Sequence, residues 1–340
     1  MSEVANPVPL AGLHTVSVVI PVYQGARTLP ALLKEIEPLT SPFRTPDGHS
    51  MRISEVLLSY DHGPDGSAEV IRELASEYDF VRLIWLSRNF GQHAATLAGM
   101  ASSGGDWIAT MDEDGQHDPA ELAAFLDAAV ARQAAVVYGD PVNTAPHGPV
   151  RNAGSRLTKR ILARLLSRDD MSLFQSYRLV LGEIGRSVAA YAGAGVFLDV
   201  AMSWVNDRTA VVPIRLRAEN SRPSGYTMRR LLSHFWRMIL TSGTRGLRLV
   251  SAVGAAFAVV GVLLAIYVVI ARLFNLVSVQ GWASVMVAFL LGTGAILFAL
   301  GIIAEYIGVA VNMAMGKPLY LIVSDPADSP LSRRPSAPHE

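Results

Sequence analysis

The stretch TMDEDGQHDP, residues 110–119, places four acids, a glutamine and a histidine directly after the apolar run WIA. Asp112 and Asp114 are separated by one residue, and side chains two positions apart in an extended chain point the same way. Gln116 follows Gly115, which permits a sharp bend. Carboxylate and amide oxygens are hard ligands, so these three side chains predict a site for Mg²⁺ or Mn²⁺ that leaves open positions for phosphate oxygens.

The alternative interpretation of this stretch is an acidic turn that binds nothing. Asp118 precedes Pro119, and this pair is typical of the residues that cap the next helix. Asp118 therefore needs no further role. For Asp112 and Asp114 we favour metal binding, because other polar clusters of the chain are expected to converge on the same place.

The N-terminal half of the chain predicts strands that alternate with helices. Strands are expected at residues 15–23, 53–61, 81–87, 106–112 and 134–140, with helices at 28–39, 67–78, 92–104 and 119–133. This alternation predicts an α/β domain with an open, mostly parallel sheet. Ligands of such sheets lie beyond the carboxyl ends of the strands. The polar clusters YQG, YDHGPDG, SRNFG and DEDGQHD stand at four of these ends, so we expect them to form one site.

The middle and the end of the chain are less regular. Residues 151–167 predict a basic amphipathic helix, whereas 195–205 and 209–219 predict strands, with a helix as the alternative for the first of these. His93 and His117 fall near the expected site, where His117 could touch the ligand or make a polar surface contact. The segment that starts at Asp325 is rich in proline and serine, so we expect it to be disordered.

Two apolar runs in the last third of the chain are each long enough to cross a hydrocarbon core of about 30 Å as a helix. No charged residue lies between Arg248 and Arg272, or between Arg272 and Glu305. We predict a two-helix transmembrane hairpin over 246–308, with a pair of buried core helices as the alternative. The basic and aromatic segment 227–245 is expected to lie in the membrane interface as an amphipathic helix.

Charge and composition limit the functions that the chain can have. We expect a multi-pass protein of the inner (plasma) membrane. Basic residues cluster before the first apolar run, so the positive-inside rule predicts that the N-terminal domain and both termini lie in the cytosol. The net charge is zero, and we therefore expect no general attraction for nucleic acid. The chain has no cysteine, which excludes disulfides, thiolate metal sites and cysteine nucleophiles.

Several of these motifs together resemble the inverting family-2 glycosyltransferases of GT-A fold. Within that family the chain most resembles the polyprenyl-phosphate sugar transferases, the dolichyl-phosphate mannose synthase and GtrB-like group. The stretches that carry the resemblance lie at residues 16–33, 87–100, 111–122, 220–232 and 281–322, within a similarity that spans about residues 15–323. The resemblance implies a GT-A (Rossmann-like), mostly parallel sheet domain followed by an interfacial amphipathic helix and two transmembrane helices.

The domain boundaries that follow are a leader at 1–14, a cytosolic GT-A domain at 15–226, an interfacial helix at 227–245, a transmembrane hairpin at 246–308 and a cytosolic C-terminal tail at 309–340. The implied reaction moves a sugar from a UDP- or GDP-linked donor to a polyprenyl phosphate, such as undecaprenyl phosphate. The transfer would invert the configuration at the anomeric carbon and depend on Mg²⁺ or Mn²⁺. Its product would be used to build a cell-envelope glycan. Related proteins suggest a homo-oligomer formed through the membrane helices, although the oligomeric state stays open.

The resemblance also implies roles for individual residues. Asp112, Asp114 and Gln116 would hold the metal. The donor would be bound by Pro21, Val22, Tyr23, Gln24, Asp61, Asp112, Arg222, Ser224 and Tyr226. Asp61 would contact the base, and Arg222, Ser224 and Tyr226 would close over the diphosphate, with a lipid-facing charge as the alternative for Arg222. The catalytic set would be Asp112, Asp114 and Arg178.

Three motifs depart from the family pattern. The usual YNE is YQG here, Tyr60 replaces the first acid of the usual DDGS, and Ser176 replaces the acid of DFRL that assists catalysis in some members. A phosphate monoester has its second pKa near 6 and is a dianion at neutral pH, so as an acceptor it needs little help from a base. It does need a cation to position it, for which Arg178, Arg151 and Arg156 are candidates. The last two could instead lie on a solvated helix face.

Two alternative functions stay open at this point. The chain could extend a polysaccharide or glycosylate another lipid, although the Q-x-x-R-W motif of processive members is absent from it. It could also be a non-catalytic relative that binds lipid or scaffolds a complex.

Overall fold

The computed structural model describes residues 12–143, 175–192, 198–205, 208–217, 281–316 and 318–330, together with scattered positions between 254 and 274. The chain divides into two compact units. One is the sheet domain, to which the segment that starts at Pro318 also belongs, and the other is the segment Tyr226–Lys317. The expected helix at 151–167 and the expected interfacial segment at 227–245 lie outside the described residues.

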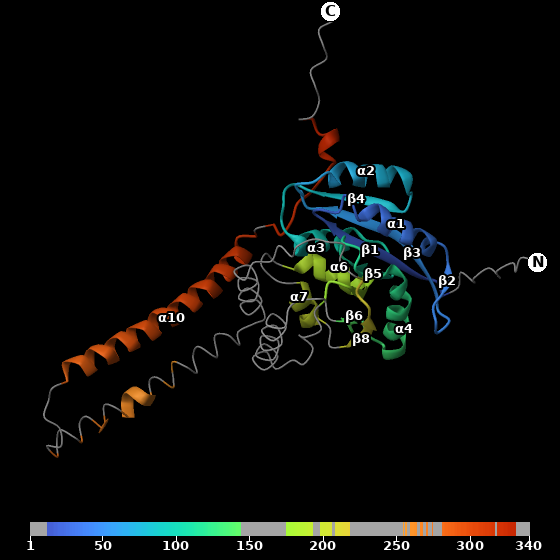
Figure 1. Ribbon diagram of the computed structural model, residues 1–340. Coiled ribbons are helices and arrows are strands. Elements are labelled where there is room, and N and C mark those ends of the chain that lie inside the picture. The colour runs from blue at the N-terminus through green and yellow to red at the C-terminus, as the bar shows by residue number, and fades with distance from the viewer. Residues whose placement is uncertain are drawn as a thin grey trace, which may run out of the picture. The chain divides into compact units, whose positions relative to one another are not determined.

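The sheet domain is built on one mixed sheet. Its described strands are β1 (His14–Val22), β2 (Phe43–Arg44), β3 (Ser50–Tyr60), β4 (Val81–Leu86), β5 (Trp107–Thr110), β6 (Val136–Pro141), β7 (Arg178–Leu181), β8 (Thr209–Ile214) and β9 (Ile322–Val323). They follow the order β8-β6-β7-β5-β1-β3-β4-β9, with β2 paired to β3 (Figure 1). The central strands β5, β1, β3 and β4 are parallel, whereas β7 runs antiparallel to both β5 and β6. The predicted α/β domain with a parallel central sheet is therefore confirmed.

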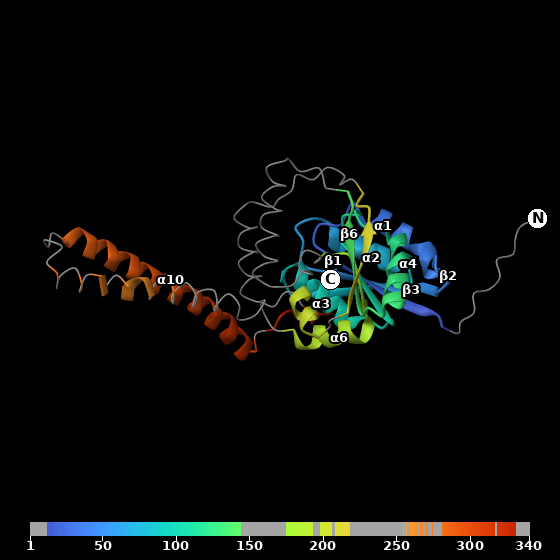
Figure 2. The same ribbon diagram turned by 90° about the horizontal axis from the view of Figure 1, so that it is seen from below.

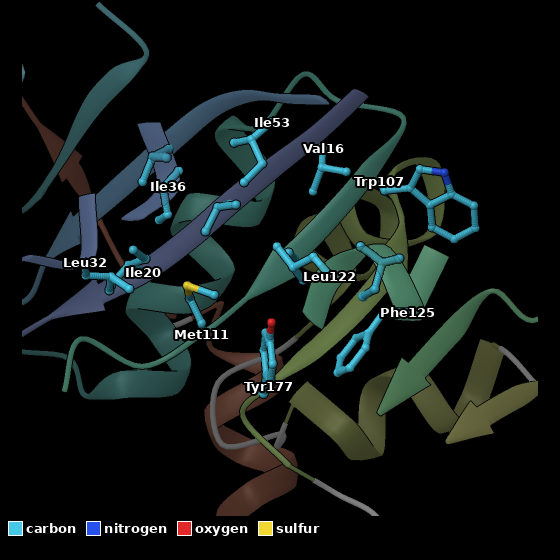
Figure 3. Close-up of a cluster of buried hydrophobic side chains, with 14 of the residues drawn as sticks. Val16, Ile20, Leu32, Ile36, Ile53, Trp107, Met111, Leu122, Phe125 and Tyr177 are labelled. Atoms are coloured by element: carbon cyan, nitrogen blue, oxygen red, sulfur yellow. The ribbon is translucent and has the colours of Figure 1, made fainter. Parts of the chain in front are cut away.

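Helices cover both faces of this sheet. They are α1 (Leu29–Ile36), α2 (Ser67–Glu77), α3 (Gln92–Ser102), α4 (Leu122–Arg132), α6 (Gly182–Tyr191) and α7 (Leu198–Val205). One apolar cluster packs α1, α2 and α4 against the sheet, and a second packs α3, α6 and α7. Figure 2 shows α1 and α4 on the other side of the sheet from α3 and α6. In the first cluster, Ile20 of β1, Leu32 of α1 and Phe125 of α4 point into one core (Figure 3).

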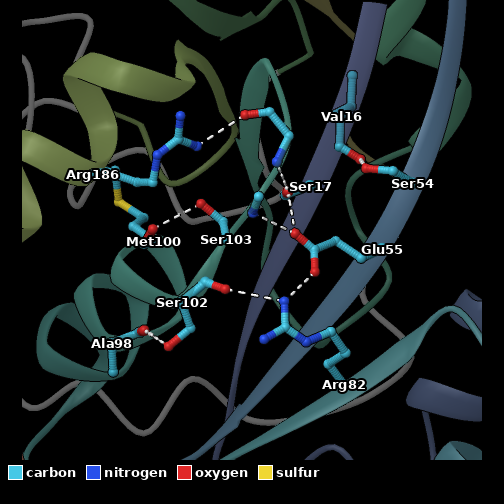
Figure 4. Close-up of polar contacts among 12 residues, drawn as sticks. Val16, Ser17, Ser54, Glu55, Arg82, Ala98, Met100, Ser102, Ser103 and Arg186 are labelled. Carbon is cyan, nitrogen blue, oxygen red and sulfur yellow. Dashed lines mark hydrogen bonds and ion pairs between the residues drawn. The ribbon is translucent and has the colours of Figure 1, made fainter.

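A polar network fixes the strands near their amino ends (Figure 4). The Glu55 carboxylate accepts hydrogen bonds from the Ser17 hydroxyl and the Gly104 N–H, both at 2.6 Å, and pairs with Arg82. The Ser17 oxygen in turn accepts the N–H of Gly105 at 2.8 Å. This network lies at the end of the sheet away from the polar clusters that the sequence singles out, so its role is structural.

One predicted strand is a helix in the structure. Residues 195–205 were expected to form a strand with a helix as the alternative, and Leu198–Val205 form α7. The buried residues Leu198, Ala201 and Met202 recur at the spacing of one helix face, which an apolar run does not reveal on its own.

The prediction that the chain is disordered from Asp325 is wrong for residues 325–330. Asp325 accepts hydrogen bonds from Nε and Nη2 of Arg72, both at 2.7 Å, and caps the 3₁₀ turn η4 (Pro326–Asp328). Just before it, β9 pairs with β4 and forms the edge of the sheet, and the Ser87 N–H donates to the Leu321 carbonyl at 2.9 Å. These partners lie far away in sequence, so local composition does not show them.

The second unit contains α10 (Trp282–Ala314), which extends beyond the expected end of the hairpin at residue 308. Large apolar side chains are exposed along it, among them Phe289, Phe298 and Ile307. Within the described residues, no helix combines the length and the apolarity that crossing a membrane requires.

Candidate active site

A cavity of about 160 Å³ opens where β1 and β5 end and α3 begins. This is the position at which ligands of parallel sheets bind. The walls come from five elements or the residues next to them, and include Pro21, Gln92, Asp112, Ser176, Arg178 and Asp199. Three of these six residues, Pro21, Asp112 and Arg178, were predicted from the sequence to belong to the site.

The Asp112 carboxylate is held from two sides at the edge of this cavity. The Gln92 side chain donates to Oδ1 at 2.6 Å, and the Ser176 hydroxyl donates to Oδ2 at 2.6 Å. An acid at position 176, as in the family pattern, would place a second negative charge against Asp112. The serine instead stabilises the Asp112 carboxylate, so the departure at this position is compatible with a working site.

The rest of the acidic stretch forms a compact turn. Gly115 has a φ of +74°, a backbone conformation that favours glycine. Across this bend, the backbone N–H and the side-chain amide of Gln116 donate to the two carboxylate oxygens of Asp114, both at 3.0 Å. Asp118 accepts the Ala120 N–H at 2.9 Å and caps the following 3₁₀ helix η2 (Pro119–Glu121), as predicted.

His117 closes the turn from within the core. Its Nδ1 accepts the N–H of Asp112 at 3.1 Å, and its ring stacks on Tyr177 with the centroids 4.6 Å apart. Burial lowers the pKa of His117, although Asp112 and Asp114 lie near enough to oppose that shift. A neutral imidazole can accept the hydrogen bond, so His117 supports the backbone of the turn and makes no surface contact.

The donor set of the turn fits a divalent cation that arrives with a substrate. Asp112 and Asp114 supply carboxylates, and Gln116 lies against Asp114. In the described part of the chain, no group of three or more histidine, cysteine or acidic side chains could hold a metal by itself. Mg²⁺ is usually bound by one or two carboxylates together with water and substrate phosphates. Two carboxylates are therefore enough for a site that a diphosphate completes.

Glu113 links the acidic turn to the loop after β1. Its carboxylate oxygens accept the backbone N–H groups of Tyr23 and Gln24, both at 2.9 Å. The sequence prediction missed this residue, although alternation along the chain already directs Glu113 away from Asp112 and Asp114. Tyr23 is 43% exposed beside this contact, whereas Val22 is fully buried in the core, so its side chain lines no pocket.

Asp61 organises a third loop. Its carboxylate accepts the backbone N–H groups of Phe90 at 2.6 Å and Gly91 at 2.8 Å, immediately before Gln92 and α3. Asp61 is 3% exposed, and this burial raises its pKa. Both oxygens face the loop, so the expected contact between Asp61 and a nucleotide base stays a prediction.

These contacts bring the four polar clusters together, as the sequence predicts. Glu113 of the cluster DEDGQHD accepts a hydrogen bond from the backbone of YQG. Asp61 of YDHGPDG accepts one from the backbone of SRNFG. Gln92, which directly follows SRNFG, donates one to Asp112 of DEDGQHD. The clusters YQG and YDHGPDG approach each other so closely that a Cβ on Gly63 would lie 1.4 Å from the Tyr23 carbonyl oxygen. The predicted donor residues Arg222, Ser224 and Tyr226, and the candidate cations Arg151 and Arg156, lie outside the described residues.

Arg178 is buried in a polar cluster on the far wall of the cavity. Its Nε donates to the Thr110 hydroxyl at 3.1 Å, and its Nη1 forms an ion pair with Asp199 of α7. The Tyr138 hydroxyl donates to the same Asp199 oxygen at 3.2 Å, and burial raises the pKa of Tyr138 well above its usual value. The sequence prediction missed Asp199. The one feature of the sequence that could have indicated its role is that it is an isolated acid within an apolar run.

The sequence of the chain is similar to those of known glycosyltransferases. The model of the family described as glycosyl transferase family 2 matches residues 17–181. An undecaprenyl-phosphate 4-deoxy-4-formamido-L-arabinose transferase from Pseudomonas fluorescens (strain Pf0-1) is 29% identical, over 91% of this chain and 89% of its own length. The transferase of the same name from Proteus mirabilis (strain HI4320) is 28% identical, over 91% of this chain and 93% of its own.

Similar solved structures include glucosyl-3-phosphoglycerate synthase from Mycobacterium tuberculosis, crystallised with Mn²⁺ and uridine-diphosphate-glucose. It covers 68% of this chain and 79% of its own at 20% sequence identity, with a TM-score of 0.47.

Proposed function

Since the chain belongs to glycosyl transferase family 2, we propose that it transfers a sugar from a nucleotide-sugar donor to undecaprenyl phosphate or a closely related polyprenyl phosphate. The relatives named for this reaction align with nine-tenths of the chain, which includes the region after the sheet domain. The observation that carries the proposal is the position of Asp112. It lies at the edge of a cavity, at the end of a parallel strand, with both carboxylate oxygens held in place.

The proposed reaction is a single displacement. An oxygen of the acceptor phosphate forms a bond to the anomeric carbon, while the bond from that carbon to the diphosphate oxygen breaks. The nucleoside diphosphate leaves with the electron pair, and the configuration at the anomeric carbon is inverted. When bound by Asp112 and Asp114, with Gln116, a divalent cation would neutralise the charge that develops on the leaving diphosphate.

The acceptor explains how the site works without an acid at position 176. A phosphate dianion carries its negative charge before the reaction starts, so no side chain has to remove a proton from it. Ser176 is therefore sufficient as a hydrogen-bond donor to Asp112. Positioning of the two substrates accounts for much of the rate, because it removes the entropic cost of bringing them together.

Transfer into lipid tests this function directly. The purified protein is incubated with undecaprenyl phosphate, Mn²⁺ and a panel of radiolabelled UDP- and GDP-sugars. We expect one donor to yield labelled product in the organic phase, and EDTA to reduce the rate at least about 100-fold, since the leaving group loses its counter-charge. Label that enters lipid at the same rate in EDTA would contradict the metal site. No transfer from any donor would contradict the function.

We further propose that the apolar runs within 246–308 anchor the enzyme as a two-helix hairpin in the inner membrane, with the sheet domain and both termini in the cytosol. Support comes from the charge-free runs in the sequence and from the apolar side chains that α10 exposes. A membrane lipid as acceptor also requires the site to work at the bilayer surface.

Single cysteines test this topology, because the chain has none of its own. A membrane-impermeant maleimide on intact cells is expected to label a Ser278→Cys variant, between the two runs, and to leave a Ser324→Cys variant unlabelled. Both variants should react after the membrane is opened. Labelling of Ser324→Cys in intact cells would show that the proposed orientation is wrong.

A further inference from the structure

A short segment after α10 completes the edge of the sheet. Residues 318–329, which we call the C-terminal strap, belong to the sheet domain, and β9 within them forms the edge of the sheet beside β4. The strand β9 consists of Ile322 and Val323 alone. Strands in globular proteins are usually about 3–10 residues long, so a ladder of this length needs further contacts to stay in place.

Asp325 provides the strongest of these contacts. Its carboxylate accepts hydrogen bonds from Nε and Nη2 of Arg72, both at 2.7 Å, and from the Ala327 N–H at 2.8 Å. The Arg72 guanidinium also lies 4.7 Å from the centroid of the Trp85 ring, and Trp85 faces Val323 across the ladder. Two parallel hydrogen bonds between arginine and a carboxylate combine strength with a fixed geometry, and they lower the pKa of Asp325. Removing this carboxylate should therefore release the strap.

The strap also holds the loop that follows β4, residues 87–91. The Ser87 N–H donates to the Leu321 carbonyl at 2.9 Å, so the first residue of the loop is bonded to the strap. Partly buried side chains of the loop and the strap pack against one apolar cluster, and they are Phe90, Leu319 and Tyr320. If the strap left β4, the Ser87 N–H would lose this partner and the loop would lose its support at the edge of the sheet.

The loop ends at the residue that orients Asp112. Asp61 accepts the Phe90 N–H at 2.6 Å and the Gly91 N–H at 2.8 Å, and Gly91 has a φ of +93°. Gln92 comes next, as the first residue of α3, and its side chain donates to Oδ1 of Asp112 at 2.6 Å. A loop this short has a limited reach, since each residue spans at most about 3.6 Å, so a shift at its start also moves its end. The position of Gln92 therefore depends on the contacts at the start of the loop.

We propose that the C-terminal strap positions the active site by fixing the loop 87–91, from which Gln92 orients Asp112. This inference rests on the proposed function, in which Asp112 is a ligand of the divalent cation. Asp325 is then a positioning residue: it touches neither substrate nor cation, and it acts by keeping the strap on β4. Because the strap lies after α10 in the chain, it can dock only once the apolar runs within 246–308 have been synthesised. The site thus reaches its full affinity in a chain that already contains the proposed anchor.

Titration calorimetry of the full-length protein with UDP and GDP in excess Mn²⁺ tests the proposal. In Asp325→Ala we expect the affinity for the nucleotide that binds to fall at least about fivefold, since a cation-binding carboxylate that is less well oriented loses part of a charge-assisted hydrogen bond. Asp328→Ala is the matched control, because Asp328 is exposed in the same turn η4. It should keep the wild-type affinity within about twofold.

Two measurements show whether the strap acts through the loop. In a Gln92→Ala background, Asp325→Ala should weaken nucleotide binding less than about twofold further, because residues that act along one chain of contacts are not additive. A loss of general stability would add in full. Hydrogen exchange of residues 87–91 should also be at least about fivefold faster in Asp325→Ala than in Asp328→Ala, since the loop opens more often.

The outcomes are distinct. If neither nucleotide binds the wild type with Mn²⁺, the proposed function fails and the inference fails with it. If a nucleotide binds but Asp325→Ala matches the wild type, or weakens binding equally in both backgrounds, the inference alone is overturned. Weaker binding that requires Gln92, together with faster exchange in the loop, supports it. Where Gln92→Ala itself binds too weakly to measure, the exchange rates decide: a faster rate at residues 87–91 supports the inference and an unchanged rate overturns it.

Discussion

Replacing Asp112 with asparagine is expected to lower kcat/KM for sugar transfer by about 100- to 1,000-fold, the range found when one group that stabilises charge in a transition state is removed. The change keeps the shape of the side chain but removes the charge that would hold the cation. It also sets an amide group against Gln92 and Ser176, both of which donate hydrogen bonds to the carboxylate. Initial rates measured over a range of Mn²⁺ concentrations check the prediction. The Mn²⁺ concentration that gives half the maximal rate should be higher in the variant than in the wild type.

Asp106→Asn provides the matched control for this change. Asp106 directly precedes β5, so it lies at the opposite end of the strand that Asp112 follows, and it accepts hydrogen bonds from the backbone and the hydroxyl of Thr15. The control should lower stability but leave kcat/KM within about threefold, because it is remote from the charge that develops in the reaction. Wild-type rates and metal dependence in Asp112→Asn would contradict the assignment of Asp112.

The convergence of the four polar clusters was predictable because it depends on topology alone. Parallel strands end at the same edge of a sheet, so Tyr23, Asp61, Gln92 and Asp112 had to lie near one another once the strands alternated with helices. The role of each side chain at this edge depends instead on its orientation and its hydrogen-bond partners, which the topology does not determine. The Asp61 carboxylate turns to the Phe90 and Gly91 N–H groups, a choice that the sequence does not show.

Long-range partners explain what the sequence did not reveal. The antiparallel strand β7 enters between β5 and β6 and carries Arg178 into the cavity, but the sequence pattern predicted no strand at residues 178–181. Asp199 pairs with Arg178 from α7, a segment whose sequence is equally compatible with a strand. The segment after Pro318 is held by the ion pair between Asp325 and Arg72 and by the pairing of β9 with β4. In each case a tertiary contact determines the local structure, and no short pattern encodes that contact.

Replacing Glu113 with glutamine is expected to weaken binding of the nucleoside diphosphate by about 10- to 100-fold. The carboxylate accepts two backbone N–H groups, from Tyr23 and Gln24, and a hydrogen bond to a charged group contributes about 1.5–3 kcal/mol. A glutamine offers one acceptor oxygen, so one of the two N–H groups loses its hydrogen bond to residue 113 and the loop after β1 is held less firmly. Calorimetry with UDP or GDP in excess Mn²⁺ measures the change, and the exposed Glu69→Gln serves as control.

Metal affinity separates this loop effect from the role of Asp112. Because Glu113 faces the loop after β1, Glu113→Gln should change Mn²⁺ affinity less than about threefold, whereas Asp112→Asn should reduce it strongly. Glu113→Asp keeps the charge but shortens the side chain, so it should fall between the wild type and Glu113→Gln in nucleotide affinity. If Glu113→Gln weakened Mn²⁺ binding as much as Asp112→Asn does, Glu113 would be a metal ligand, and the division of the acidic turn into a metal-binding side and a loop-holding side would have to be given up.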